Sequence, residues 1–167
     1  MGSTRHPRHG GRPDLVNALE TIKGVHKITM QIFEESKNIP GLVWDFQFEP
    51  LSRHIQDQSA ARGGNSLGLG GTKEDLLIMF IMPLWSDAAY DEQVYATAQN
   101  WHAKVQAYTN TRGKGHRFEF STYAAKFQHV MASYGSESLE FLRAVSRKYD
   151  PKQIFQRSLK GGYKLGI

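Results

Sequence analysis

The chain has 167 residues, enough for one domain with a buried core. Its hydrophobic content of 40% and charged content of 22% are ordinary for a globular protein. It contains no cysteine, which excludes disulfides, thiolate metal sites and a cysteine nucleophile. No apolar run approaches the roughly 20 residues of a membrane helix, and the N-terminus lacks the apolar core of a signal peptide. We therefore expect a cytoplasmic protein with no membrane partner.

The net charge of +5 is concentrated at the two ends of the chain. Residues 1–12 carry three arginines, and residues 152–167 carry four lysines or arginines, with no acid in either segment. The residues between them are therefore slightly acidic. We expect residues 1–12 to be a disordered basic leader and the C-terminal segment to be solvated. Basic ends on an acidic body do not predict a nucleic-acid partner.

After the leader, apolar residues follow the spacing of a helix, which Gly24 either divides in two or merely weakens. The segment from Leu42 to Glu49 then alternates between apolar and polar residues, which is typical of a half-buried strand. Pro50 is expected to end this strand. A short helix over residues 51–61 follows and carries His54.

A glycine-rich connection spans residues 63–71. It lacks the Gly-Lys-Ser/Thr ending of a phosphate-binding loop and the spacing of a dinucleotide turn, so we interpret it as a tight turn. The apolar run from Asp75 to Leu84 predicts a central strand that is covered on both faces. The stripe from Val94 to Tyr108 predicts a long helix. Residues 116–123 alternate again, which predicts a third strand.

The last predicted helix carries Leu139, Leu142 and Val145 and ends before Asp150-Pro151, because a residue that precedes proline disfavours helical geometry. Helices and half-apolar strands that alternate in this way indicate an α+β fold. We expect helices packed on one face of an antiparallel sheet, in a single domain over residues 13–167.

The C-terminal run SYGSESLEFLRAVSRKYDPKQIFQRSLKGGYKL resembles the C-terminal signature of FAD-linked oxidases of the berberine-bridge type, in particular the secondary-metabolite oxidases of filamentous fungi. Further landmarks of the resemblance are the Trp44–Pro50 strand, Gly63-Gly64-Asn65 and Tyr123-Ala124. The resemblance implies a substrate-binding domain whose sheet has helices on one side and faces a flavin on the other. The FAD-binding domain of that family has no counterpart in this sequence, so we expect no cofactor.

Two local departures agree with that expectation. Thr122-Tyr123-Ala124 stands where the family tends to have Asn-Tyr-Ala, and Gln128-His129-Val130 stands where it tends to have Gln-Asp-Pro. Without a flavin domain, the open face of the sheet would expose a large apolar area, which monomers rarely tolerate. We expect this face to form a pocket or interface closed by a second copy, as a homodimer, or to be covered by a separate flavoprotein.

Our first hypothesis is a flavin-independent enzyme of secondary-metabolite biosynthesis that acts on a small hydrophobic natural product, such as a polyketide. A cyclisation, isomerisation, dehydration or pericyclic closure needs only a shaped apolar pocket and one or two acid–base groups. The alternative is a non-catalytic accessory chain that pairs with a separate FAD-binding oxidoreductase. A degenerate gene fragment is a third reading, although the apolar periodicity is intact in every predicted element.

Candidate site residues come from the two alternating segments and their neighbours. The catalytic candidates are Asp45, Glu119, Tyr123 and His54, and the substrate-binding candidates are Trp44, Gln47, Glu49, Trp85 and Phe118. A carboxylate on an otherwise apolar sheet tends to have a raised pKa, which suits acid–base catalysis. An alternating Asp or Glu is more often simply the solvent face of a half-buried strand. No histidine pair has metal-ligand spacing with a nearby acid, so we expect no metal.

Overall fold

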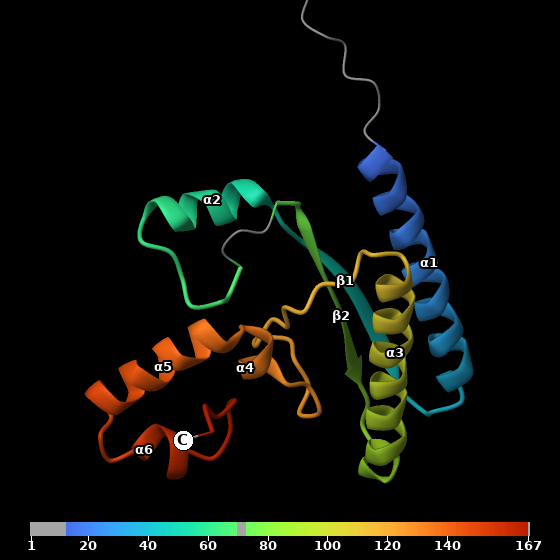
Figure 1. Ribbon diagram of the computed structural model, residues 1–167. Helices are drawn as coiled ribbons and strands as arrows, with labels where there is room; N and C mark the ends of the chain where they lie inside the picture. Colours follow the sequence, from blue (N-terminus) through green and yellow to red (C-terminus); the bar gives the residue numbers. More distant parts are fainter. Residues whose placement is uncertain (1–12, 70–72, 167) are drawn as a thin grey trace, which may run out of the picture. The chain divides into compact units, whose positions relative to one another are not determined.

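The computed structural model describes residues 13–69 and 73–166, with side chains from residue 19 onward (Figure 1). The predicted disordered leader, residues 1–12, lies outside the described residues. Within them lie α1 (Pro13–Ser36), β1 (Val43–Leu51), α2 (Arg53–Ala61), β2 (Leu76–Leu84), a 3-10 helix η1 (Ala88–Tyr90), α3 (Asp91–Thr111), α4 (Val130–Ser133), α5 (Ser136–Tyr149) and α6 (Ile154–Arg157). The two strands pair as an antiparallel sheet, so the predicted α+β class is confirmed.

The described chain falls into two compact units. The first unit contains the described residues up to Trp44 together with Pro83–His116, and the second contains Asp45–Met82 and the residues from Arg117 onward. The single domain over residues 13–167 therefore stays a prediction. None of the helices in the described part is long and apolar enough to cross a bilayer.

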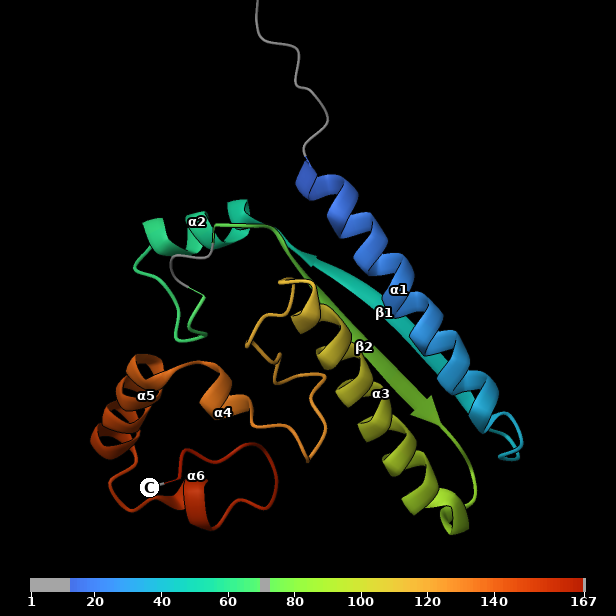
Figure 2. The same cartoon turned by 45° about the vertical axis from the view of Figure 1, so that its right-hand side comes forward.

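The first unit is built on α1 and α3, which contact each other and lie side by side in Figure 1, and whose axes run in nearly the same direction across Figure 2. Each helix buries one stripe: Val25, Thr29 and Ile32 on α1, and Val94, Trp101 and Val105 on α3. The indole Nε1 of Trp101 donates a hydrogen bond of 2.9 Å to the hydroxyl of Thr29. Tyr108 reaches the carbonyl of Glu20 at 3.4 Å, so the two helices run antiparallel. The stripe predicted for α3 therefore forms the core of this unit.

Helix α1 continues unbroken through Gly24. A Cβ at this position would lie 1.8 Å from the hydroxyl oxygen of Tyr108 and 2.2 Å from its ring carbon Cζ. Glycine therefore stands where the tyrosine ring of α3 passes directly against α1. The sequence pattern marked Gly24 as a weak point of the helix, and the close packing of Tyr108 gives the physical reason for it.

Replacing Gly24 by alanine is expected to destabilise the first unit by about 1–3 kcal/mol, because the Tyr108 ring must move away from a packed position. This is the net loss that remains after the roughly 1 kcal/mol by which alanine favours a helix over glycine. Urea unfolding of the single variant measures it. In a Tyr108→Ala background the same change is expected to be neutral or stabilising, and an equal loss in both backgrounds would contradict this explanation.

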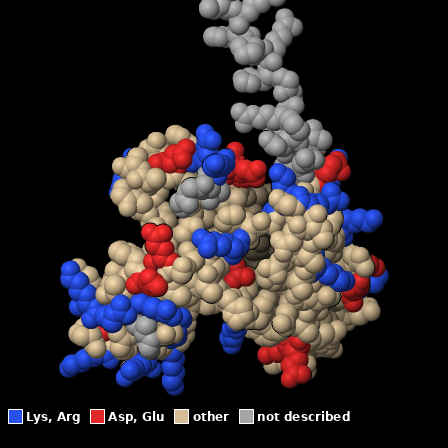
Figure 3. All heavy atoms as spheres, viewed as in Figure 1, with Lys and Arg blue, Asp and Glu red and all other residues tan. Residues whose placement is uncertain are grey.

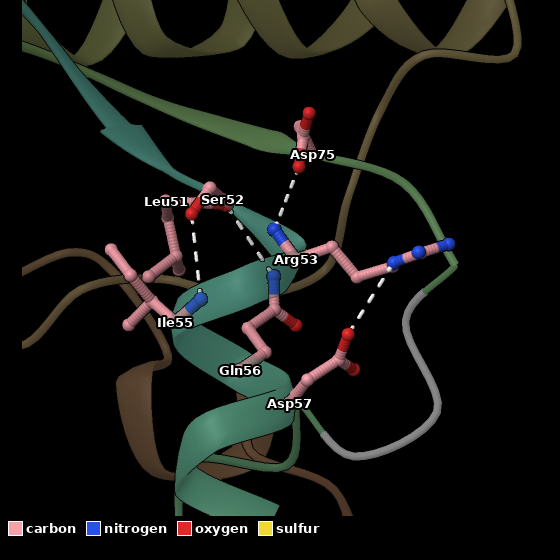
Figure 4. A network of polar contacts seen from close by, with 7 residues as sticks. All are labelled: Leu51, Ser52, Arg53, Ile55, Gln56, Asp57 and Asp75. Atoms are coloured by element: carbon pink, nitrogen blue, oxygen red, sulfur yellow. Dashed lines mark hydrogen bonds and ion pairs between the residues drawn. The ribbon is translucent and has the colours of Figure 1, made fainter.

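In the second unit, α2 begins directly after β1 and is fixed at its first turn (Figure 4). Ser52 accepts a hydrogen bond of 3.4 Å from the amide of Ile55 and so caps the helix. The amide of Arg53 donates to the carboxylate of Asp75 at 2.7 Å, immediately before β2 begins. Figure 4 shows these contacts, which link the end of one strand to the start of the next.

Strand β1 follows the predicted alternation except at Asp45. Trp44, Phe46 and Phe48 are half-buried while Gln47 and Glu49 are exposed, but Asp45, on the predicted polar side, is half-buried too. Pro50 does not end the strand, which continues to Leu51. Proline is tolerated there because each strand of a two-stranded sheet has an unpaired edge.

Two predictions about the sheet are wrong. Residues 116–123 do not form a third strand, and β2 is not a central strand, because within the described residues the sheet has only two strands. The amide of Glu119 instead donates to the side chain of Ser133 at 3.1 Å. Phe118 stacks on Tyr134, with ring centroids 5.8 Å apart. The alternation in this segment therefore reflects ring packing and not a strand ladder.

The basic C-terminal segment exposes its lysines and arginine to solvent, as its charge predicted, but it is folded and not a free tail. Lys164 donates to the carbonyls of Phe155 and Leu159 at 2.9 and 2.8 Å. Arg143 of α5 donates to the carbonyl of Leu165 at 2.9 Å. Other lysines and arginines of this region gather as a basic surface around α5 and α6 (Figure 3, lower left). The segment is therefore folded back onto the helices that precede it.

Candidate functional site

Five aromatic rings of the second unit form a row in which each ring contacts the next, and we name this set the aromatic chain. Phe80 of β2 stacks on Tyr123 with centroids 3.9 Å apart and planes 16° apart. Tyr123 meets Phe120 edge-on at 5.3 Å, Phe120 lies 6.2 Å from Phe118, and Phe118 stacks on Tyr134. Phe80 and Tyr134 are buried, whereas Tyr123 is 42% exposed. The aromatic chain therefore connects buried rings of the second unit to the partly exposed phenol of Tyr123.

The phenol of Tyr123 is paired with the carboxylate of Glu49 at the end of β1. The negative charge of Glu49 is the largest cause that raises the pKa of Tyr123, followed by desolvation and a hydrogen bond to the same carboxylate. Tyr123 therefore keeps its proton well into the alkaline range. Because Glu49 is also exposed, a substrate can reach both groups. A phenol and a carboxylate side by side can serve as general acid and general base.

Replacing Glu49 by glutamine is expected to lower the pKa of Tyr123 toward its ordinary value of about 10, because the repelling charge is removed. The raised pKa of Tyr123 contributes to the stability of the folded state. This contribution is fully present below about pH 10, and it is lost as the pH rises through the pKa that Tyr123 has in the folded chain. Tyrosine-resolved NMR titration measures the change, and Glu92→Gln on α3 is the control. A Tyr123 titration that is the same with and without the Glu49 charge would contradict the pairing.

A second phenol, that of Tyr163, lies beside the backbone that follows Tyr123. Burial is the largest cause that raises the pKa of Tyr163, and Glu119 and Tyr134 raise it further. The hydroxyl of Tyr163 donates to the carbonyl of Ala124 and also lies 3.1 Å from the carbonyl of Ala125. Glu119, a predicted catalytic residue, is therefore near enough to Tyr163 for its charge to raise the pKa of that phenol.

The structure brings some of the predicted site residues together. Tyr123 pairs with Glu49, which the sequence assigned only to substrate binding, and Phe118 belongs to the aromatic chain. Asp45 accepts a hydrogen bond from the side-chain amide of Gln47 on the same strand. His54 is an exposed residue of α2 and belongs neither to the aromatic chain nor to the Glu49–Tyr123 pair.

The two predicted tryptophans belong to the first unit. Trp44 stacks on Phe33 with centroids 5.1 Å apart, and its indole donates to Ser36 at 2.9 Å. Trp85 donates to the carboxylate of Asp91 at 2.7 Å. These contacts hold both indoles within the packing of that unit, and their roles in substrate binding stay predictions.

The sequence reasoning missed Phe80, Phe120, Tyr134 and Tyr163 as members of the site. One signal was present, because Phe118 and Phe120 are two residues apart and can point to the same side of an extended segment. The partners of these two phenylalanines lie in other elements, so periodicity alone could not identify them.

The chain is 38% identical over 109 residues to the FAD-dependent monooxygenase sdcF of Emericella nidulans, a match that covers 65% of this chain and 23% of that protein. It is 31% identical to the Oligopeptidase PhomG' of Diaporthe leptostromiformis, over 90% of this chain and 12% of that protein. It is 27% identical to the bifunctional solanapyrone synthase of Alternaria solani, over 91% of this chain and 29% of that protein.

The chain spans less than a third of the length of these curated relatives. No protein-family model and no solved structure matches it. The similarities relate most of the chain to part of fungal FAD-dependent monooxygenases. They do not test the berberine-bridge-type signature.

The described residues of the glycine-rich segment do not fit the phosphates of FAD. The amides of Gly63 and Gly64 donate to the carbonyls of Ala60 and Ser59, at 3.2 and 2.8 Å, and so close the end of α2. A Cβ at Gly68 would lie 1.8 Å from the carbonyl oxygen of Tyr134, so this glycine accommodates the protein's own backbone. A bound phosphate is held by backbone amides that point at it. The amides of Gly63 and Gly64 instead bond to carbonyls of α2, so these residues do not offer such a site.

Proposed function

We propose that the chain is the substrate-side part of an enzyme of fungal secondary-metabolite biosynthesis, and that Tyr123 and Glu49 perform a non-redox acid–base step on a hydrophobic substrate. The observation that carries this proposal is the partly exposed phenol of Tyr123, which stacks on Phe80 and whose pKa is raised by the nearby carboxylate of Glu49. The likeness to a solanapyrone synthase and to FAD-dependent monooxygenases supports the biosynthetic setting.

The proposed step moves protons and no electrons to or from a cofactor. The Glu49 carboxylate takes a proton from a carbon beside a carbonyl, while the Tyr123 hydroxyl gives its proton to the carbonyl oxygen or to a leaving hydroxyl. Glu49 then passes the proton to the neighbouring phenolate of Tyr123, which restores both groups to their starting states. An isomerisation, a dehydration or a cyclisation of the resulting enol follows from the same transfer.

The aromatic chain supplies the apolar contact that such a substrate requires. Phe80 supports one face of the Tyr123 ring and Phe120 meets it edge-on. A flat, unsaturated substrate would bury apolar surface against these rings. Such binding orients the reacting carbon toward the acid–base pair, and this orientation contributes to catalysis.

A partner chain is part of the proposal. The second unit exposes large apolar side chains on α5, on α6 and directly after α6: Phe141, Tyr149, Ile154, Phe155 and Leu159. Such a surface supports an interface, either with a second copy as a homodimer or with a separate flavoprotein. Light scattering of the purified chain separates a dimer from a monomer.

The second candidate function is an accessory chain, favoured by the similarity to FAD-dependent monooxygenases. In that case the same surface binds an FAD-containing protein, and the redox chemistry belongs to the partner. Tyr123 and Glu49 would then orient the substrate.

Flavin dependence separates the two candidates. A strain from which the coding sequence is deleted accumulates the substrate, which can be isolated and given to the purified chain. We expect a colourless protein that consumes this compound at the same rate with and without added FAD. Consumption that requires both FAD and a flavoprotein would overturn the acid–base proposal and support the accessory function.

A further inference from the structure

The backbone that follows Tyr123 is held by Tyr163, a residue near the end of the sequence. Tyr123 ends a turn in which its amide donates to the carbonyl of Phe120 at 3.1 Å. The next two carbonyls, those of Ala124 and Ala125, both face the hydroxyl of Tyr163. The amide of Ala125 donates to the side chain of Gln128 at 2.7 Å. The segment is therefore held by the turn that ends at Tyr123 and by Tyr163 and Gln128 directly after it.

Tyr163 is itself held in place by the folded C-terminal segment. Gly161 and Gly162 adopt positive φ angles of 108° and 65° directly before it, which allows the chain to reverse. Directly after it, Leu165 donates its amide to the side chain of Gln156 at 2.9 Å and accepts a bond from Arg143. The position of the Tyr163 hydroxyl is thus set by contacts with α5 and α6.

The charge state of Tyr163 suits this role. Burial, Glu119 and Tyr134 all raise its pKa, so the phenol stays a donor over the whole physiological range. Carbonyl oxygens only accept hydrogen bonds, so a protonated phenol is the form that can bind Ala124 and Ala125.

We infer that Tyr163 is a positioning residue that holds the Ala124–Ala125 backbone and thereby sets the distance between the phenol of Tyr123 and the carboxylate of Glu49. This inference rests on the proposed function only for its effect on turnover. Its structural part, the control of the Tyr123 environment by Tyr163, is measurable without any substrate.

The test uses the full chain with tyrosine labelled at the ring carbon that bears the hydroxyl. Tyr123→Phe identifies the Tyr123 resonance, and pH titrations then compare the native chain with Tyr163→Phe. We expect Tyr123 to ionise at lower pH in Tyr163→Phe, because the released segment no longer holds the phenol against Glu49. Turnover is expected to fall about tenfold, with little change in KM. Tyr95→Phe, at a tyrosine of α3 that is 48% exposed, is the matched control.

An identical Tyr123 titration in the native chain and in Tyr163→Phe would overturn the inference. If Tyr163→Phe does not fold, Arg143→Lys loosens the same segment at Leu165. That variant is expected to shift the Tyr123 titration in the same direction, and no shift would again overturn the inference. If Tyr163→Phe shifts the titration but Tyr123→Phe leaves turnover unchanged, the positioning by Tyr163 holds and the proposed acid–base function fails.

Discussion

A Tyr123→Phe chain is expected to turn over the substrate about 100-fold more slowly than the native chain. The substitution keeps the ring that stacks on Phe80 at 3.9 Å and removes only the hydroxyl. Because that hydroxyl is the proposed proton donor, the loss is expected in kcat and not in KM. The thermal unfolding midpoint is expected to change little, since the aromatic contacts remain and the hydroxyl that is lost belongs to a partly exposed ring.

Steady-state kinetics on the isolated substrate measure this effect. Tyr95→Phe removes the hydroxyl of another exposed tyrosine and is expected to leave kcat unchanged. If Tyr123→Phe is as fast as the native chain, Tyr123 is part of the packing and not of the chemistry.

The second large effect is expected at Gly68. A Cβ there would lie 1.8 Å from the carbonyl oxygen of Tyr134 and 2.6 Å from its carbonyl carbon, at a φ of +71°. Backbone atoms cannot rotate aside as the end of a side chain can. Gly68→Ala is therefore expected to destabilise the second unit by about 3 kcal/mol. The Phe118–Tyr134 stack should be lost with it.

Urea unfolding followed by near-ultraviolet circular dichroism reports both the stability and the aromatic packing. Gly63→Ala is the matched control, because Gly63 also has a positive φ, of +98°, but a Cβ there would meet nothing within 4 Å. Both variants carry the backbone strain of a non-glycine residue at positive φ. The difference between their free energies of unfolding therefore measures the close approach of Gly68 to Tyr134 alone. Equal losses would show that the conformation of glycine, and not the contact, accounts for the effect.

Much of the secondary structure could be predicted from local periodicity. The alternation of β1 and the stripe of α3 are properties of neighbouring residues, and the structure confirms both, except at Asp45 of β1. The third strand was predicted wrongly because alternation has the same appearance whether a segment pairs with a strand or packs its rings. Phe118 and Phe120 pack against rings, and the amide of Glu119 bonds to Ser133.

The candidate site could be predicted only in part. Tyr123 and Glu49 were each identified from their own segments, but their pairing depends on how β1 and a distant loop meet. The bond from Tyr163 to Ala125 spans 38 residues of sequence, and no local pattern encodes it. Gly24 was noticed as an anomaly of its helix, while its cause, the ring of Tyr108, lies on another helix.

The central claim, a non-redox acid–base step at Tyr123 and Glu49, is tested most directly by the mass of the product. The native chain, free of flavin, is incubated with the isolated substrate beside the Tyr123→Phe chain. The account predicts a product of unchanged mass, or one lighter by a single water, that forms with the native chain and is strongly reduced with the variant. A product that differs by two hydrogens or by one oxygen would contradict it.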